Sequence, residues 1–138
     1  MNRLGFCLCL LAIIAPALPA AKLNRDQRFF DTQVAPILTK RCLSCHNQQL
    51  NNGNISFLDR DSLLKRGRRG PAVVPRKPEE SELVESLRHD GELQMPPGPK
   101  LAPREIRVLT DWIRRGAVWG TKLRRRGDFQ QPNSSGAR

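Results

Sequence analysis

Two cysteines and a histidine with a short, regular spacing are the residues of this sequence best suited to chemistry. Residues 42–46 read Cys-Leu-Ser-Cys-His, which is the attachment spacing of c-type haem. Near the end of a helix this spacing puts both thiols on one side, where each can form a thioether with a haem vinyl group. His46 then comes under the iron as proximal ligand, and its other ring nitrogen is expected to donate to a backbone carbonyl, with residues 70–75 as the candidates. The motif predicts one covalent haem, held by Cys42, Cys45 and His46.

A second axial ligand for the iron can be sought by elimination. Once an N-terminal signal is removed, only Met95 and His89 remain among the usual side chains for this role. Met95 is preferred because Pro96 and Pro97 follow it, which pushes its backbone toward extended conformations and stiffens its loop. A lone methionine elsewhere commonly fills a gap in a core, but beside a haem motif the ligand role is favoured. His89 is interpreted as a surface residue near a helix C-terminus.

Two other kinds of site could use the same cysteines. Cys42, Cys45, His46 and His89 make a nominal Cys2His2 zinc set, but adjacent Cys45 and His46 would have to bind one tetrahedral metal, and common zinc spacings separate such ligands. A thiol-disulfide centre places its Cys-x-x-Cys at the start of a helix after a strand, whereas a helix is expected before this one. Both remain as unfavoured alternatives. An absorbance spectrum separates them from haem, which alone gives sharp visible bands when reduced.

The first twenty residues have the features of an export signal. Arg3 supplies a positive start, an apolar run covers 4–15, and small residues follow, with cleavage preferred after Ala20. The run is shorter than the roughly 18 to 20 residues of a membrane-spanning helix, which favours a cleaved signal over the alternative, an uncleaved anchor. Cleavage leaves Cys42 and Cys45 as the only cysteines, in the oxidising setting of a periplasmic or otherwise exported protein.

The charge of the chain is strongly positive. The formal net charge is +11 and falls to +10 when Arg3 leaves with the signal. Such a charge favours redox partner proteins with an acidic docking face, or an anionic membrane surface. Solvation of helix faces and of a tail explains the charge equally well. Nucleic acid is not expected as a partner, because the protein is expected to be exported and the chain has no Tyr and only five Phe.

Helices are expected on both sides of the cysteine motif. The apolar spacing predicts a helix over 25–38, with a kink or restart at Pro36, leading into Cys42. A short helix is predicted from Asp59 to Arg66, with Gly67 as a left-handed stop.

Two more helices are expected after a loop over 67–78. One covers 79–89 and ends at Gly91, and the last begins at Pro103 and ends at Gly116. The last helix is expected to bury Ile106, Leu109, Trp112 and Ile113. The fold class is therefore all-α, with three to five helices and long loops packed around the haem. A haem domain is expected over 25–120, with a disordered basic tail over 121–138.

Several short motifs occur in order around the cysteines. They are Val34-Ala-Pro-Ile-Leu38, Gly70-Pro-Ala-Val-Val-Pro75, Pro78-Glu-Glu-Ser-Glu-Leu83, Met95-Pro-Pro97 and Trp112-Ile-Arg-Arg-Gly-Ala117. In these motifs the chain resembles the planctomycete-type cytochrome c domain, a branch of the class I cytochrome c fold, over about Phe30 to Trp119. It departs from the family in Arg76-Lys77, where Gly and Asp are common, and in Ala102, where a capping Ser, Thr or Asp is common.

The resemblance implies the same site as the motif. It puts the haem on Cys42 and Cys45, with His46 as proximal and Met95 as distal ligand. With both axial positions filled, no open site remains for a substrate, so an electron carrier is expected rather than an enzyme. The alternative is a haem sensor or peroxidase-like module with an open sixth position.

Overall fold

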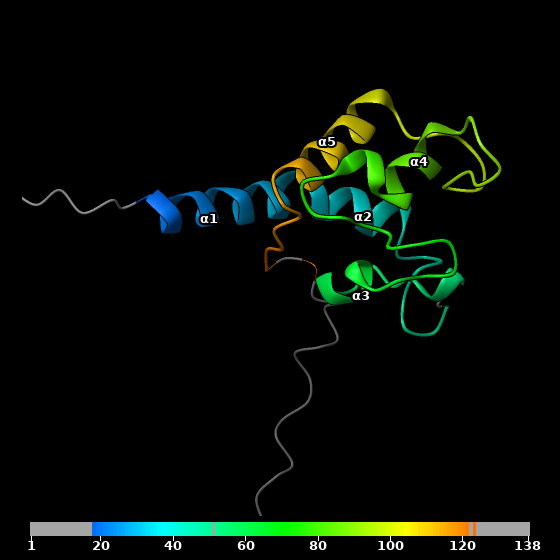
Figure 1. The fold of residues 1–138 in the computed structure, drawn as a ribbon, viewed down its shortest axis with the longest axis horizontal. Helices are drawn as coiled ribbons and strands as arrows, with labels where there is room; N and C mark the ends of the chain where they lie inside the picture. Colours follow the sequence, from blue (N-terminus) through cyan, green and yellow to red (C-terminus); the bar gives the residue numbers. More distant parts are fainter. Residues whose placement is uncertain (1–17, 51, 122, 124–138) are drawn as a thin grey trace, which may run out of the picture.

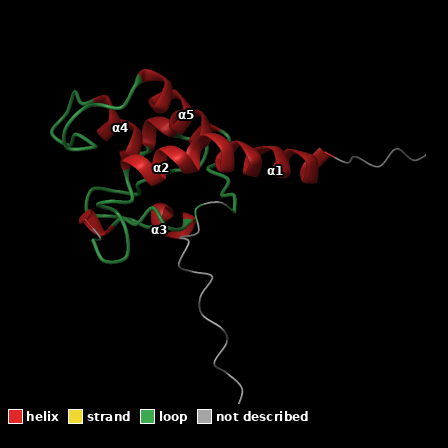
Figure 2. Ribbon diagram, turned by 180° about the vertical axis from the view of Figure 1, so that it is seen from behind, coloured by secondary structure: helices red, strands yellow, loops and turns green. Residues whose placement is uncertain are grey.

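The described part of the protein is helical, as expected. The structure is a computed structural model that describes residues 18–50, 52–121 and 123. Within these residues the chain forms helices joined by long loops, and the pairing of Arg66 with Pro71 is an isolated bridge rather than a strand. Figures 1 and 2 show α2, α4 and α5 gathered in one group, with α3 and its loops on one side. The all-α prediction is confirmed for this part of the chain.

The N-terminal helical run leads directly to the cysteine motif. It consists of α1 (Leu18–Phe29), a π-helical segment (Phe30–Val34) and α2 (Ala35–Arg41). The first half of α1 projects from the rest of the molecule in both views (Figures 1 and 2). This helix includes Ala20, the residue before the expected cleavage point, while residues 1–17 of the expected signal lie outside the described part.

The expected restart at Pro36 takes the form of a wider helical turn. A proline inside an α-helix lacks an N–H donor, and its ring collides with the carbonyl four residues earlier. The π-helical turn before α2 removes this conflict, with the N–H of Ala35 donating to the carbonyl of Phe30, and Pro36 falls in the first turn of α2. The restart therefore begins upstream of the proline.

The short helix α3 (Arg60–Leu64) begins as expected and ends earlier. The Asp59 carboxylate accepts from the backbone N–H of Ser62 at 2.8 Å, which is an N-terminal cap. The helix ends because Lys65 is extended, with φ −68° and ψ 152°. Gly67 does not adopt the left-handed conformation expected of it. Its N–H instead donates to Gly70 at 2.8 Å, in a turn that follows the helix.

The helix predicted over 79–89 is shorter at both ends. Residues Pro78–Glu80 form a 3-10 turn, and α4 covers Glu82–Arg88. The left-handed residue that ends α4 is His89, with φ 55°, and not Gly91. A histidine in this conformation is uncommon, and its side chain makes a contact described below.

The last helix, α5 (Pro103–Arg114), packs against the N-terminal run to form the core. Leu109, Trp112 and Ile113 are buried as expected, whereas Ile106 is only partly buried. The Trp112 ring lies 5.7 Å from that of Phe30, centroid to centroid. Other buried side chains of this core are Val34, Leu38, Leu63, Val73, Leu83, Val84, Leu87 and Leu101.

The chain after α5 returns to the N-terminal run. The ring of Trp119 lies 4.3 Å from that of Phe30, centroid to centroid. Thr121 donates its backbone N–H to the Asp31 carboxylate at 2.7 Å, and Leu123 is buried. Contacts with the helical body therefore extend to Leu123, past the boundary expected at Gly120, and residues 122 and 124–138 lie outside the described part.

None of the described helices is long and apolar enough to cross a membrane.

Candidate haem site

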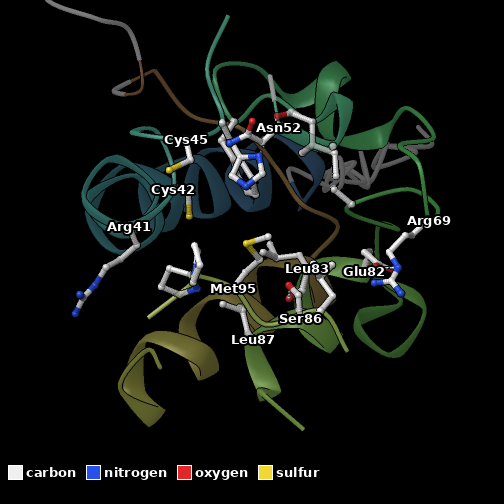
Figure 3. Close-up of a pocket in the computed structure, with 18 of the residues that line it drawn as sticks. Arg41, Cys42, Cys45, Asn52, Arg69, Glu82, Leu83, Ser86, Leu87 and Met95 are labelled. Carbon is white, nitrogen blue, oxygen red and sulfur yellow. Dashed lines mark hydrogen bonds and ion pairs between the residues drawn. The ribbon is translucent and has the colours of Figure 1, made fainter. Parts of the chain in front are cut away.

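One cavity among the described residues brings the predicted site residues together. Its volume is about 590 Å³, within the range of small-molecule and cofactor sites, ~300 to 1,000 Å³. Cys42, Cys45, His46 and Met95 all line it. In Figure 3 the two cysteines lie across the cavity from Met95. The remaining walls are largely apolar and include Ile55, Phe57, Ala72, Leu83, Leu87, Leu93, Pro96, Pro97 and Leu101.

The cysteine motif continues the turn that ends α2. The N–H of Cys42 donates to the carbonyl of Leu38 at 2.9 Å, and the N–H groups of Cys45 and His46 both donate to the carbonyl of Cys42, at 3.1 and 3.0 Å. This turn brings the two free thiols to the same cavity. Burial raises the pKa of the Cys42 thiol from 9.0 to about 12, despite the charge of Arg41 nearby. Reactive disulfide-exchange thiols have a lowered pKa, so this thiol differs from such a centre.

The other ring nitrogen of His46 faces a different carbonyl from the one expected. Its Nδ1 lies 3.2 Å from the carbonyl oxygen of Ile55, not from a carbonyl of residues 70–75. The chain after the motif folds back over His46: the N–H of Phe57 donates to the His46 carbonyl at 3.0 Å, and the two rings meet edge to face at 5.4 Å between centroids. A carbonyl only accepts, so Nδ1 must carry the hydrogen, which leaves the Nε2 lone pair free for a metal.

Met95 is held by the last turn of α4. Its N–H donates to the carbonyl of Ser86 at 3.0 Å, and the Nε2 of His89 lies 2.9 Å from its carbonyl oxygen. Figure 3 shows Met95 beside Ser86, Leu83 and Leu87 on one wall of the cavity. His89 is therefore near a helix C-terminus, as predicted, but it is half-buried and bound to the Met95 backbone rather than a simple surface residue.

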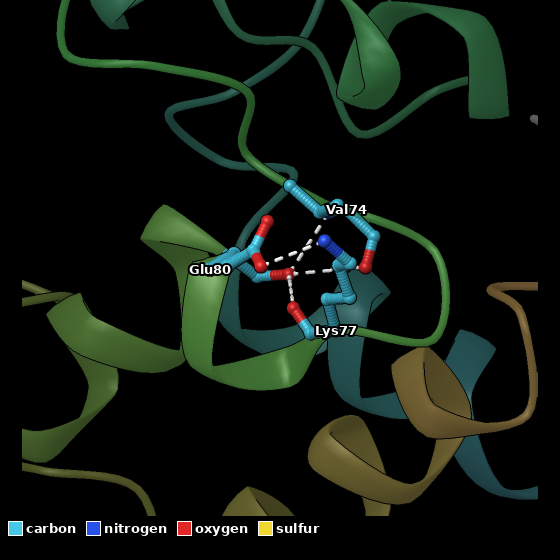
Figure 4. A network of polar contacts seen from close by, with 4 residues as sticks. Val74, Lys77 and Glu80 are labelled. Carbon is cyan, nitrogen blue, oxygen red and sulfur yellow. Dashed lines mark hydrogen bonds and ion pairs between the residues drawn. The ribbon is translucent and has the colours of Figure 1, made fainter.

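A buried serine fixes the loop that leads into this wall. The Ser81 hydroxyl oxygen accepts from the backbone N–H of Val74 at 2.9 Å and lies 2.8 Å from the carbonyl of Lys77. Figure 4 shows this network, together with the ion pair between Lys77 and Glu80. Ser81 is the residue before α4, so the network sets where the helix begins. The N–H of Leu83 then bonds the carbonyl of Ala72 at 3.0 Å, which joins two cavity-lining segments.

Arginines stand around the cavity. Figure 3 shows Arg41 and Arg69 at opposite ends of it. Arg41 forms a two-point contact with Glu105 of α5, at 3.2 and 3.3 Å. Arg69 lies 2.9 Å from Glu92 and 3.8 Å from Glu82. The exposed Arg68 also lines the cavity, so the site has an apolar interior and an edge on which Arg41 and Arg69 are paired with carboxylates.

The zinc alternative has no support in the described residues. No group of three or more His, Cys, Asp and Glu side chains in this part of the chain could hold a metal ion. The nominal fourth zinc ligand, His89, contacts the carbonyl of Met95.

The comparison with protein families agrees with this site. Residues 42–99 match the family model described as Planctomycete cytochrome C. The resemblance to this family is therefore confirmed over that range, which contains the cysteine motif, α3, α4 and the Met95 loop. The motifs at Val34–Leu38 and Trp112–Ala117 lie outside it. No curated protein and no solved structure gives a match.

The family match and the side chains that line the cavity are consistent with the same cofactor. A cytochrome c family implies covalently bound haem, and the cavity offers two thiols, an imidazole with a free nitrogen and a thioether in a largely apolar setting. Imidazole and thioether are side-chain ligands of haem iron in c-type cytochromes. The residues present therefore fit the group, and the match over residues 42–99 supports a haem-binding segment similar to Planctomycete cytochrome C.

Two contacts of the site were not predicted from the sequence. The Ile55 carbonyl belongs to a loop without apolar periodicity, and nothing in its local pattern marks it as the partner of His46. The contact of His89 with Met95 joins two residues six positions apart across the end of a helix. The one available signal was that His89 and Met95 lie at the two ends of the same short loop.

Proposed function

We propose that the protein is an exported, mono-haem c-type cytochrome that carries electrons, with His46 and Met95 as the axial ligands. The observation that carries this proposal is that the motif and Met95, separated by 49 positions in the sequence, line the same apolar cavity from opposite sides (Figure 3). The haem, packed among the helices as in class I cytochromes c, would supply one-electron chemistry at its iron.

Different residues of the chain are proposed to attach the haem and to provide its axial ligands. Cys42 and Cys45 provide the covalent attachment, because a thiol adds to a vinyl group as a thioether. His46 offers Nε2, since its Nδ1 is engaged by the Ile55 carbonyl. Met95 offers a soft sulfur from a loop tied to α4. Histidine and methionine together favour a comparatively high reduction potential.

An electron carrier follows from two occupied axial positions. A substrate or oxygen needs an open position at the iron, and the proposed ligands leave none. The protein is thus proposed to exchange electrons and not to act as an enzyme. A sensor or peroxidase-like module requires the opposite, a position that external ligands reach readily.

The partners are proposed to be redox proteins with an acidic docking face. The net charge of the chain is +11, or +10 once Arg3 leaves with the signal, and the exposed Arg68 lines the cavity itself. Opposite charge steers such encounters and loses its effect as salt screens it. An anionic membrane surface is the second candidate, whereas nucleic acid is not proposed. Periplasmic or other export rests on the N-terminal features of the sequence.

The experiment that tests the proposal is mass spectrometry of the exported protein together with a reduced-minus-oxidised spectrum. One covalent haem added to a chain that begins at Ala21 is expected, with sharp reduced bands. A Cys42→Ala, Cys45→Ala double variant should lose the covalent mass. A mass without haem, or a spectrum without these bands, would refute the proposal.

The ligand assignment is tested by replacing Met95 with Ala. The expected result is loss of the weak sulfur-to-iron absorption of the oxidised form and ready binding of carbon monoxide by the reduced form. Leu93→Ala is the matched control, because Leu93 lines the same cavity from the same loop and has no ligand atom. Ready carbon monoxide binding by the unaltered protein would favour the sensor or peroxidase-like reading.

A further inference from the structure

Both backbone polar groups of Met95 are bound at the C-terminal end of α4. The N–H donates to the carbonyl of Ser86 at 3.0 Å, and the carbonyl oxygen lies 2.9 Å from Nε2 of His89. Ser86 is buried in the last turn of the helix, and His89 is the residue that ends it. The Met95 backbone is therefore held at two points at the end of α4.

The contact with His89 has a defined chemical direction. A carbonyl oxygen can only accept, so Nε2 of His89 must carry the hydrogen. The left-handed backbone of His89, with φ 55°, ends the helix at the residue whose ring reaches the loop. Pro96 and Pro97 have no N–H, so the two residues after Met95 contribute no backbone donors to hold this loop.

A methionine ligand depends on such backbone anchoring more than other ligands do. Its side chain is unbranched, has three rotatable bonds and adapts readily to gaps. A mobile backbone in this loop would add to the conformational freedom of these torsions, and the sulfur would be bound to the iron for a smaller fraction of the time. Holding the peptide in place before binding reduces the ordering cost of forming the bond.

We propose that His89 is a positioning residue for the Met95 ligand, which it holds toward the haem through the Met95 carbonyl. This inference rests on the proposed axial ligation by His46 and Met95. His89 does not touch the iron and acts only through the backbone of Met95. Its removal should weaken the sulfur-to-iron bond while the helices remain intact.

The test is His89→Gly in the haem-loaded protein. Glycine is the preferred residue at a left-handed helix end, so this change relieves the backbone and removes only the ring. Arg76→Gly is the matched control, because Arg76 is also a non-glycine residue at positive φ, 69°, and does not line the cavity. Melting followed by circular dichroism reports folding, and titration of the ferric protein with imidazole reports how readily Met95 is displaced.

The expected result is a His89→Gly protein that melts no lower than Arg76→Gly, binds imidazole about five-fold more tightly than wild type, and has a weaker sulfur-to-iron absorption. Five-fold corresponds to one neutral hydrogen bond. His89→Gln, whose side-chain amide can donate to the same carbonyl, should recover part of the wild-type affinity.

Failure of the role proposed for His89 can be distinguished from failure of the proposed ligation by Met95. If wild type has the sulfur-to-iron absorption and His89→Gly has the same absorption and the same imidazole affinity as wild type, the role of His89 is overturned and the ligation stands. If wild type itself lacks the absorption, the ligation by Met95 is wrong, and the role of His89 falls with it.

Discussion

Replacing Gly120 with Ala tests whether the chain after α5 is held against the N-terminal helical run. A Cβ at Gly120 would meet the Asp31 carboxylate, at 2.6 Å from its Cγ, and would lie 2.8 Å from the carbonyl oxygen of Gln27. Real Cβ contacts are longer than this, so something must move. The Gln27 oxygen belongs to the backbone of α1, and the carboxylate is held by Thr121 at 2.7 and 3.1 Å. Neither group can move away from the added methyl group without disturbing α1 or weakening the hydrogen bonds of Asp31 with Thr121.

The expected change in the free energy of unfolding is the sum of opposing effects. Overpacking costs about 1 to 3 kcal/mol, and weakening the exposed contacts between Asp31 and Thr121 adds about 1 kcal/mol. Gly120 is not at positive φ, so alanine also stabilises by about 0.4 to 1 kcal/mol through the unfolded chain. We expect a net loss of about 2 kcal/mol, or about 10 °C in melting temperature for a domain of this size.

The assay is denaturant and thermal unfolding of the haem-loaded protein, followed by circular dichroism. Gly91→Ala is the control, because no atom lies within 4 Å of a Cβ there and its φ is not positive. The control should unfold at or slightly above the wild-type midpoint. Asp31→Ala combined with Gly120→Ala should cost less than the sum of the two single changes, because the carboxylate that obstructs the methyl group is gone. Equal stability of Gly120→Ala and Gly91→Ala would refute the packing of this segment.

Two further predictions concern the N-terminus of α5. Burial raises the pKa of Glu105, but hydrogen bonds from the Ala102 N–H and from Arg41 outweigh this and hold the pKa below its ordinary 4.5. The stabilising effect of the Glu105 carboxylate is therefore present above about pH 4.5 and is lost as the pH falls through the lower pKa of the folded state. Unfolding midpoints of wild type and Glu105→Gln should accordingly differ at neutral pH and converge in acid, and a constant difference would contradict the assignment. Ala102→Ser should stabilise by about 1 kcal/mol, because the Glu105 side chain already accepts from the Ala102 N–H at 3.0 Å and only the reciprocal cap is missing. Ala102→Val, which adds no acceptor, is the control, and a serine variant no more stable than the valine variant would show that the cap does not form.

The local elements of this protein could be predicted well where one pattern decided the outcome. Pro103 and the apolar spacing of Leu109, Trp112 and Ile113 predicted a helix that runs over Pro103–Arg114. Asp59 predicted the start of α3, and its carboxylate is the cap. These features depend on residues within a few positions of one another, whose geometry is the same in any fold.

Helix ends were predicted less well because they depend on competing contacts. Glycines at 67 and 91 were expected to stop two helices, yet Lys65 and His89 end them. His89 accepts a strained conformation and gains a contact with Met95, which no local pattern contains. Ala102 lacks a capping group, and Glu105 supplies half of the missing cap from inside the helix.

The sequence by itself determined the chemistry of the site: two thiols and an imidazole at the spacing of covalent haem attachment, and a single methionine beyond them in a proline-stiffened loop. Only the tertiary structure decided what holds these groups. The Ile55 carbonyl orients His46, the end of α4 anchors Met95, and the segment after α5 binds Asp31 from 90 positions away. The reason is physical: spacing along the chain governs which atoms a motif offers, whereas contacts between distant segments form only when the core has brought those segments together.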